Sequence, residues 1–246
     1  MPIRNAYEEM PKEYLHKPEN PNYDLHFFDL PFRMIVNAPS GSGKTNFIHN
    51  LLEVFCSRNG RKKGGGTFST IHIITQNSDE PIYNWIRDRC PQIIIQEGIS
   101  KLPKLDKETF DKDENHLVIC DDLVLEKKQD RIADYYIRCR KLNVSIIYLS
   151  QRFYEIPKMI RANCNYFALL KISGMKDFNL ICKEFNNNLT PQEMTKVYEY
   201  ATSTNLTPLV IDLSTRDPAK KYRKGLDEFI DIPRLLQSTN DAKGTR

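Results

Sequence analysis

The sequence lacks any apolar run long enough to cross a membrane, since none approaches the roughly 18 consecutive apolar residues that a membrane-spanning helix requires. Its beginning, Met1 to Glu19, is too charged for a secretory signal peptide. These two absences predict a soluble intracellular protein with no membrane partner. With 40 % apolar residues among its 246, the chain can bury a substantial core and fits one large α/β domain or one domain with small additions.

Paired cysteines are also missing, because no C-x-x-C motif joins any of the six cysteines. Scattered cysteines in apolar or amphipathic stretches behave as small hydrophobic residues. We therefore expect neither a zinc site nor a disulfide framework. The six are Cys56, Cys90, Cys120, Cys139, Cys164 and Cys182.

The net charge of +4 is small for a nucleic-acid-binding protein, but the charge is unevenly distributed. Residues 1–30 carry three basic and six acidic side chains, whereas residues 31–66 carry six basic side chains and one acidic. A second basic cluster lies in residues 214–225, with Asp217 as its single acid. Such clusters can bind phosphate backbones, although solvated loops have the same composition. The cluster consists of Arg216, Lys220, Lys221, Arg223 and Lys224.

Short apolar runs alternate with helical or irregular segments after residue 31, which predicts an α/β fold with a mainly parallel sheet flanked by helices. The runs are residues 34–36, 71–74, 93–95, 117–120, 144–149, 166–172 and 209–211. Apolar spacing predicts a helix over 127–142, and the capping box Thr190-Pro191-Gln192-Glu193 predicts another from there to about Ala201.

The first of these strands runs directly into the motif Ala38-Pro39-Ser40-Gly41-Ser42-Gly43-Lys44-Thr45, and an amphipathic helix follows it. This context is required of a P-loop, in which backbone N–H groups and a helix N-terminus bind the phosphates of a nucleotide. We expect residues Pro39 to Thr45 to bind the phosphates. Lys44 would neutralise the β- and γ-phosphates, and the Thr45 hydroxyl would ligate Mg²⁺. Ala38 replaces the usual first glycine, which is unfavourable if that residue needs a positive φ.

Two carboxylates, Asp121 and Asp122, follow the apolar strand 117–120. At the carboxyl end of a parallel strand, Asp121 can hold Mg²⁺ through water, and Asp122 can orient or deprotonate an attacking water. Gln151 follows the strand 144–149 and could sense the γ-phosphate if that strand lies between the other two. The simpler interpretation of the aspartates is that they cap a turn.

In this order and spacing, these elements resemble the HerA/FtsK superfamily, specifically the poxvirus-type genome-packaging ATPases of large DNA viruses and virophages. The resemblance spans most of residues 30–215, and its most telling stretches are Leu117 to Leu123, the basic helix ending near Lys141, Ser145 to Gln151, and Ile156 to Asn163. It implies a P-loop NTPase of the additional-strand, RecA-like type that uses ATP and Mg²⁺. The Walker A lysine and threonine fall on Lys44 and Thr45, the Walker B pair on Asp121 and Asp122, and the polar sensor on Gln151. Asp122 departs from the glutamate that many ATPases place there.

The resemblance also implies a motor that moves double-stranded DNA into a viral capsid, without reading the DNA sequence. Its members work as homo-oligomeric rings in which an arginine of one subunit reaches the neighbour's nucleotide. Arg161 matches that arginine best, and Arg138, Arg140 and Arg152 remain candidates. A capsid protein would be a further partner, and the protein would act in the cytoplasmic viral factory of the host cell or in association with the virion.

This interpretation divides the chain into an N-terminal extended arm (1–30), a P-loop ATPase domain (31–215) and a basic C-terminal extension (216–246). Other DNA translocases or helicase-like ATPases remain alternatives, as does a P-loop small-molecule kinase, although no arginine-rich lid is recognisable. A third alternative is a scaffold protein that binds nucleotide without hydrolysing it. A GTPase is disfavoured because the base-reading motif N-K-x-D is absent.

Overall fold

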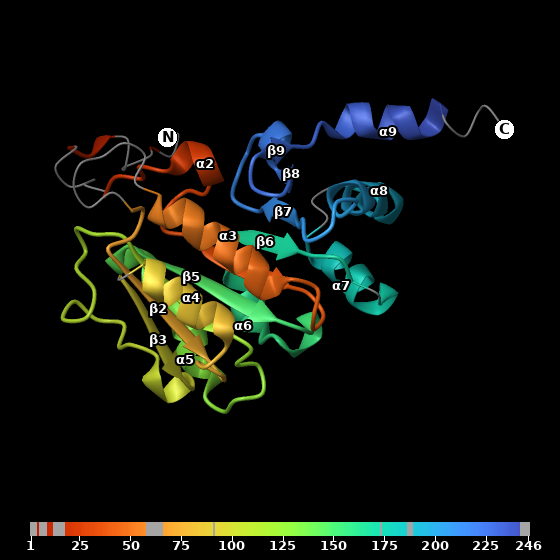
Figure 1. The fold of residues 1–246 in the computed structure, drawn as a ribbon. Helices are drawn as coiled ribbons and strands as arrows, with labels where there is room; N and C mark the ends of the chain where they lie inside the picture. The colour runs from red at the N-terminus through yellow and green to blue at the C-terminus, as the bar shows by residue number, and fades with distance from the viewer. Residues whose placement is uncertain are drawn as a thin grey trace.

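The computed structural model describes residues 4, 9–11, 18–57, 66–90, 92–172, 174–185 and 189–241. Most of residues 1–17, residues 58–65 and residues 242–246 lie outside the described residues. They include parts of the predicted N-terminal arm and C-terminal extension and most of the basic, glycine-rich segment Gly60 to Gly66. Within the described ranges, nine strands form one sheet in the order β3-β2-β4-β5-β1-β6-β7-β8-β9 (Figure 1).

The first six strands of this order are parallel to one another, which confirms the predicted mainly parallel α/β sheet. They are β1 (Arg33–Asn37), β2 (Thr70–Thr75), β3 (Ile93–Glu97), β4 (His116–Asp121), β5 (Val144–Ser150) and β6 (Tyr166–Leu169). The predicted strand 166–172 ends at Leu169, because its partner β1 ends at Asn37, where the P-loop begins.

Three antiparallel strands extend the sheet beyond β6: β7 (Leu209–Asp212), β8 (Tyr222–Lys224) and β9 (Glu228–Phe229). The sheet therefore continues past residue 215, although the three-part division of the chain stays a prediction. The basic cluster in 214–225 is not wholly a surface feature. Arg223 is only 1 % exposed, and its guanidinium lies 4.6 Å from the ring centroid of Phe28 and donates hydrogen bonds to the carbonyls of His26 and Leu226.

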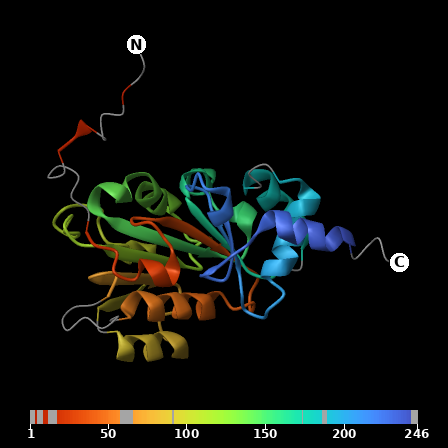
Figure 2. The same ribbon diagram turned by 90° about the horizontal axis from the view of Figure 1, so that it is seen from above.

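Helices cover both faces of the sheet (Figure 2). α3 and α4 pack on one face, and α5 to α8 pack on the other. No helix in the described ranges is long and apolar enough to cross a membrane. The α-helices are α2 (Tyr23–His26), α3 (Lys44–Cys56), α4 (Pro81–Arg89), α5 (Gln129–Arg138), α6 (Lys158–Asn163), α7 (Met175–Phe185), α8 (Pro191–Ala201) and α9 (Ile232–Asp241). Short 3₁₀ helices are η2 (Ile99–Lys101), η3 (Cys139–Leu142), η4 (Phe153–Glu155) and η5 (Pro218–Lys220).

Both helices predicted from the sequence are present. The segment 127–142 forms α5 and then tightens into η3, and its predicted apolar face is buried. The capping box is also formed, since the Thr190 side chain accepts from the Glu193 N–H, and the Glu193 carboxylate accepts from the Thr190 N–H.

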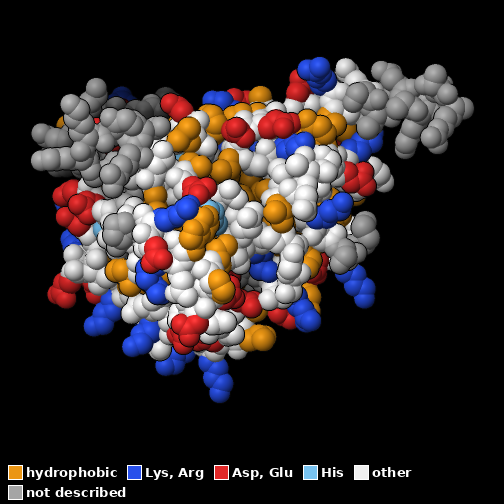
Figure 3. Space-filling model, viewed as in Figure 1, with side chains coloured by type: hydrophobic (Ala, Val, Ile, Leu, Met, Phe, Trp, Pro, Cys, Tyr) orange, Lys and Arg blue, Asp and Glu red, His pale blue; other side chains and the backbone are white. Residues whose placement is uncertain are grey.

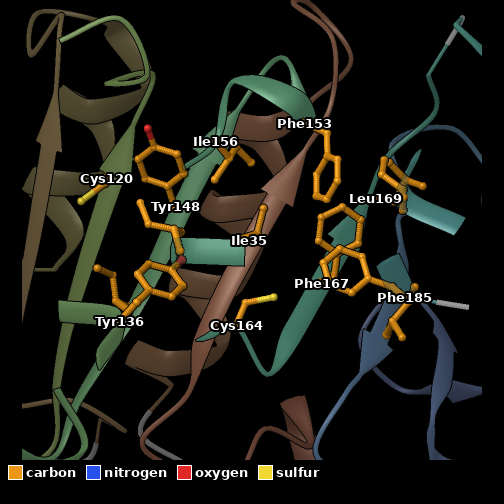
Figure 4. Close-up of a cluster of buried hydrophobic side chains, with 14 of the residues drawn as sticks. Ile35, Cys120, Tyr136, Tyr148, Phe153, Ile156, Cys164, Phe167, Leu169 and Phe185 are labelled. Atoms are coloured by element: carbon orange, nitrogen blue, oxygen red, sulfur yellow. The ribbon is translucent and has the colours of Figure 1, made fainter. Parts of the chain in front are cut away.

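A tightly packed apolar layer fixes the central strands under α5 and α6 (Figure 4). Ile35 of β1 lies among aromatic side chains of the neighbouring elements, all fully or almost fully buried. The Tyr136 hydroxyl, which has no access to water, donates a 2.5 Å hydrogen bond to the Met34 carbonyl of β1. This bond satisfies a buried polar group and ties α5 to the strand that leads into the P-loop.

Candidate active site

The strand register places the carboxyl ends of four parallel strands at one edge of the sheet. Asn37 of β1 pairs with Ser150 of β5, Asp121 of β4 pairs with Leu149 of β5, and Thr75 of β2 pairs with Asp121. The loops that follow β1, β2, β4 and β5 therefore emerge side by side, which is where open parallel sheets bind their ligands. β5 lies between β1 and β4, as the prediction for Gln151 required.

A cavity of about 370 Å³ opens at this edge. Residues from all four loops and from the start of α3 line it, and these residues are predominantly polar or charged. They are Ser40, Gly41, Gly43, Lys44, Thr45, Asn46, Thr75, Gln76, Asn77, Glu80, Asp121, Asp122 and Gln151.

The P-loop has the backbone shape that its glycines allow. Gly41 and Gly43 have φ values of +72° and +96°, and an added Cβ at Gly43 would collide with the Leu206 side chain. Both positions are unfavourable for other residues. Ala38 is not among the described residues with positive φ, and its methyl group is fully buried in the core. Alanine therefore replaces the usual first glycine without backbone strain.

Lys44 is the first residue of α3, and its ammonium group currently binds the loop itself. The Nζ atom donates to the carbonyls of Ala38 and Pro39 at 3.0 and 3.3 Å. Burial lowers the pKa of Lys44, and the carboxylates of Asp121 and Asp122 partly offset that effect. A phosphate group would supply the nearby negative charge that a partly buried ammonium lacks. The N-terminus of α3 adds its positive dipole end at the same place.

Asp121, at the end of β4, is almost completely buried beside Tyr83 of α4. The Tyr83 hydroxyl donates a short hydrogen bond to Asp121 Oδ2. Burial raises the pKa of Asp121 to about 6, although the Tyr83 hydrogen bond opposes this rise. The tyrosine fixes one carboxylate oxygen and leaves the other for a ligand.

The next residue, Asp122, is held in a different way. Its φ of +55° is unusual for a residue other than glycine. Its Oδ2 atom accepts a 2.9 Å hydrogen bond from Gln151 Nε2, which comes from the end of β5. Gln151 and Asp122 thus form a pair across two neighbouring strands, an arrangement that a turn-capping role for Asp122 does not explain.

Arg161 does not lie with the other predicted site residues. It belongs to α6, where its Nε atom forms a 3.2 Å ion pair with Glu184 and its guanidinium lies 5.0 Å from the Phe153 ring centroid. Two alternative arginines are also paired, since Arg138 contacts Asp134 and Arg152 contacts Glu155. None of these arginines lines the cavity of their own subunit.

Sequence reasoning missed the loop after β2 and the helix that follows it. The end of β2 and this loop supply Thr75, Gln76, Asn77 and Glu80 to the cavity. The helix α4 supplies Tyr83, whose hydroxyl donates to Asp121. The available signal was the same one that identified Asp121, namely polar residues directly after a buried parallel strand. It was not used because the position of β2 next to β4 is not evident in the sequence.

The region that begins at β3 and ends in β7 has recognisable relatives. Residues 92–211 match the family of the poxvirus A32 protein. The expected resemblance to poxvirus-type packaging ATPases is thereby confirmed. The A32-like region includes β4, β5, Asp121 and Gln151, whereas the P-loop precedes it and is assigned by its own geometry.

The sequence is also similar to individual poxvirus proteins. The chain is 29 % identical over 158 residues to the DNA packaging protein OPG160 of Variola virus, in an alignment that covers 58 % of this chain. The same values apply to OPG160 of Vaccinia virus. The alignment covers 54 % of each of these relatives, so the chain spans about half the length of the curated proteins it matches.

Solved structures share the fold. The genome packaging NTPase B204 from Sulfolobus turreted icosahedral virus 2, solved with ATP-gammaS, superposes with a TM-score of 0.56 at 14 % identity, covering 81 % of this chain and all of B204. The type VII secretion ATPase EccC of Thermomonospora curvata gives a TM-score of 0.52 at 10 % identity, covering 95 % of this chain and 33 % of EccC. At these identities the likeness confirms the P-loop NTPase fold and does not by itself assign a function.

Proposed function

We propose that this protein is an ATPase that drives double-stranded DNA into a viral capsid. The observation that carries the proposal is the convergence of Lys44, Asp121 and Gln151, from three parallel strands and their loops, on one polar cavity. The family match and the similarity to packaging proteins of poxviruses support the choice of motor over other P-loop enzymes.

The P-loop would bind the triphosphate of ATP. Backbone N–H groups around Gly41 and Gly43 would donate to the phosphates, as they do in such loops. The position that a Cβ at Gly41 would take is open, with no other atom within 4 Å. Lys44 would exchange its two carbonyl partners for phosphate oxygens, which carry full negative charge.

The residues at the cavity also suit Mg²⁺, which prefers oxygen ligands and keeps several of its waters. The Thr45 hydroxyl would ligate the ion directly, and Asp121 would hold one of its waters with the oxygen that Tyr83 leaves free. When bound, the ion would neutralise charge that develops on the β- and γ-phosphates. Gln151 and Asp122 would together contact the γ-phosphate or the water that attacks it.

Assembly into a ring would complete the site, with Arg161 as the preferred arginine from the neighbouring subunit. To reach that neighbour, Arg161 would have to leave its ion pair with Glu184. On the face shown in Figure 3, Lys and Arg side chains are interleaved with Asp and Glu rather than gathered in one patch. The proposed ring would contact the DNA through its phosphates, which needs no sequence readout. A capsid protein and the viral factory or the virion are its proposed partner and location.

The proposal is tested by measuring phosphate release from ATP with and without linear duplex DNA, alongside sedimentation of the protein with nucleotide. We expect hydrolysis that DNA stimulates, and assemblies larger than a monomer. An unchanged rate with DNA in a protein that stays monomeric would exclude the motor. Transfer of the γ-phosphate to a nucleoside, detected by thin-layer chromatography, would instead identify a kinase.

Removing the Tyr83 hydroxyl is expected to weaken the use of Mg²⁺. In Tyr83→Phe, the Asp121 carboxylate loses the hydrogen bond that orients it, and changes to such supporting bonds typically lower metal affinity or activity on the order of 10-fold to 100-fold. The measurement is the Mg²⁺ concentration that gives half-maximal hydrolysis. Tyr135→Phe is a matched control, because its hydroxyl donates to the Pro103 carbonyl outside the cavity. Equal Mg²⁺ requirements for both variants would refute the role of Tyr83.

A further inference from the structure

The cavity contains a third carboxylate, Glu80, at the start of α4. It lines the same space as Lys44, Asp121 and Asp122. Glu80 follows β2, which lies directly beside β4. Three strand spacings separate β2 from β1, so these two strands lie roughly 14 Å apart across the sheet. The P-loop would hold the phosphates at the β1 end of the cavity. Glu80 thus lies at the opposite end, from which a water could approach the terminal phosphate.

The fold does not use the Glu80 side chain to form α4. Glu80 is the N-cap residue, but its carboxylate makes no capping hydrogen bond. The helix begins instead with the Glu80 backbone carbonyl, which accepts from the N–H groups of Tyr83 and Asn84. Within the described residues no ion pair of the Glu80 carboxylate is found. A half-buried carboxylate at the edge of a polar cavity is therefore available to a ligand or a water.

The other two carboxylates are already engaged. Asp121 accepts from the Tyr83 hydroxyl, and Asp122 accepts from the Gln151 amide. The negative charge of Glu80 contributes to the raised pKa of Asp121 and of Tyr83, which places it within electrostatic reach of both. Glu80 is also one methylene longer than Asp122, so its carboxylate can extend further from its own backbone into the cavity.

We propose that Glu80 orients and deprotonates the water that attacks ATP, while the Gln151–Asp122 pair contacts the γ-phosphate. This inference rests on the proposed ATPase function. In the step, the water oxygen forms a bond to the γ-phosphorus and gives its proton to the Glu80 carboxylate. The bond between the γ-phosphorus and the β–γ bridging oxygen breaks, and its electron pair leaves with ADP. Glu80 then returns the proton to solvent.

The test compares the full-length wild type with Glu80→Gln, which keeps the size of the side chain and removes the base. We expect phosphate release to fall on the order of 10²-fold to 10³-fold, the size of a general-base contribution. Binding of a fluorescent ATP analogue should change less than about threefold, because no binding contact is lost. Protein recovered by gel filtration after incubation with labelled ATP should carry ATP in the variant and ADP in the wild type.

Two further variants distinguish a role of the Glu80 carboxylate in hydrolysis from a general effect of changing this loop. Asp79→Asn, an exposed residue on the same loop, should hydrolyse ATP as the wild type does. Glu80→Asp keeps the charge and should retain more turnover than Glu80→Gln, which a purely structural role would not predict. Hydrolysis by Glu80→Gln within about tenfold of the wild type would overturn the inference and leave the ATPase intact. A wild type that binds ATP without hydrolysing it would instead overturn the proposed function.

Discussion

Lys44→Ala is expected to lower ATP turnover on the order of 10²-fold to 10³-fold or more, with and without DNA. The substitution removes the cation that lies at the head of α3 beside Asp121 and Asp122. A fixed positive group aimed at developing phosphate charge contributes an effect of this size in a site that excludes bulk water. The measurement is phosphate release at saturating ATP, with and without linear duplex DNA. DNA should stimulate only the wild type.

The same variant is expected to fold normally. Burial of the Lys44 ammonium is already unfavourable, as its lowered pKa shows, so its removal costs the fold little. Of the two carbonyl groups that Lys44 binds, the one of Pro39 belongs to a half-buried residue, whereas Ala38 is fully buried, so only the Ala38 carbonyl loses a partner at a buried position. Lys127→Ala, an exposed lysine outside the cavity, is the control and should keep full activity. Substantial turnover in Lys44→Ala would show that the cavity is not the site of hydrolysis.

Asp121→Asn is expected to abolish Mg²⁺-dependent hydrolysis while making the protein more stable without Mg²⁺. The pKa of Asp121 is about 6 in the folded protein, against an ordinary value of 3.8, chiefly because the carboxyl group is buried. Each pKa unit corresponds to about 1.4 kcal/mol, so ionised Asp121 lowers the free energy of unfolding by up to about 3 kcal/mol. Asparagine keeps the shape, can still accept the Tyr83 hydrogen bond, and carries no charge.

The effect of Asp121 on the free energy of unfolding depends on pH, and the raised pKa fixes the direction of this dependence. A folded-state pKa above the unfolded value means that the folded protein holds the proton more tightly. The destabilisation by Asp121 is therefore complete above pH about 6, shrinks as the pH falls toward 3.8, and is absent below that value. Urea unfolding of both proteins without Mg²⁺ at pH 7.5 and pH 4.5 measures this difference. The advantage of Asp121→Asn should be larger at pH 7.5. An equal or smaller advantage there would contradict the burial of a charged carboxylate at this position.

The parts of the site that are contiguous in the chain could be predicted from the sequence. The P-loop is formed by eight successive residues between a strand and a helix, so its backbone geometry is encoded locally, including the positive φ of Gly41 and Gly43. Asp121 and Gln151 were identified because each follows an apolar run. The prediction that these two residues lie close to the P-loop required one assumption, namely that β5 lies between β1 and β4. The sheet order confirms this assumption.

Other features depend on which elements become neighbours. The burial of Arg223 is an example, since a cluster of basic residues predicts a solvated surface. Yet β8 adds to the edge of the sheet and carries that arginine under the aromatic ring of Phe28, nearly 200 residues earlier in the chain. Local composition cannot reveal this contact, because its two partners meet only when the N-terminal segment and the last strands pack together.

The sequence by itself determined the P-loop of Ala38 to Thr45, the mainly parallel α/β architecture and the family resemblance. Each of these depends on short contiguous patterns of glycine, charged and apolar residues. Only the tertiary structure decided which groups surround the P-loop. β2 lies beside β4, so Tyr83 contacts Asp121 and Glu80 lines the cavity, whereas Arg161 does not line it and forms an ion pair with Glu184. Strand order sets these contacts through the packing of the whole sheet, and no local signal encodes it.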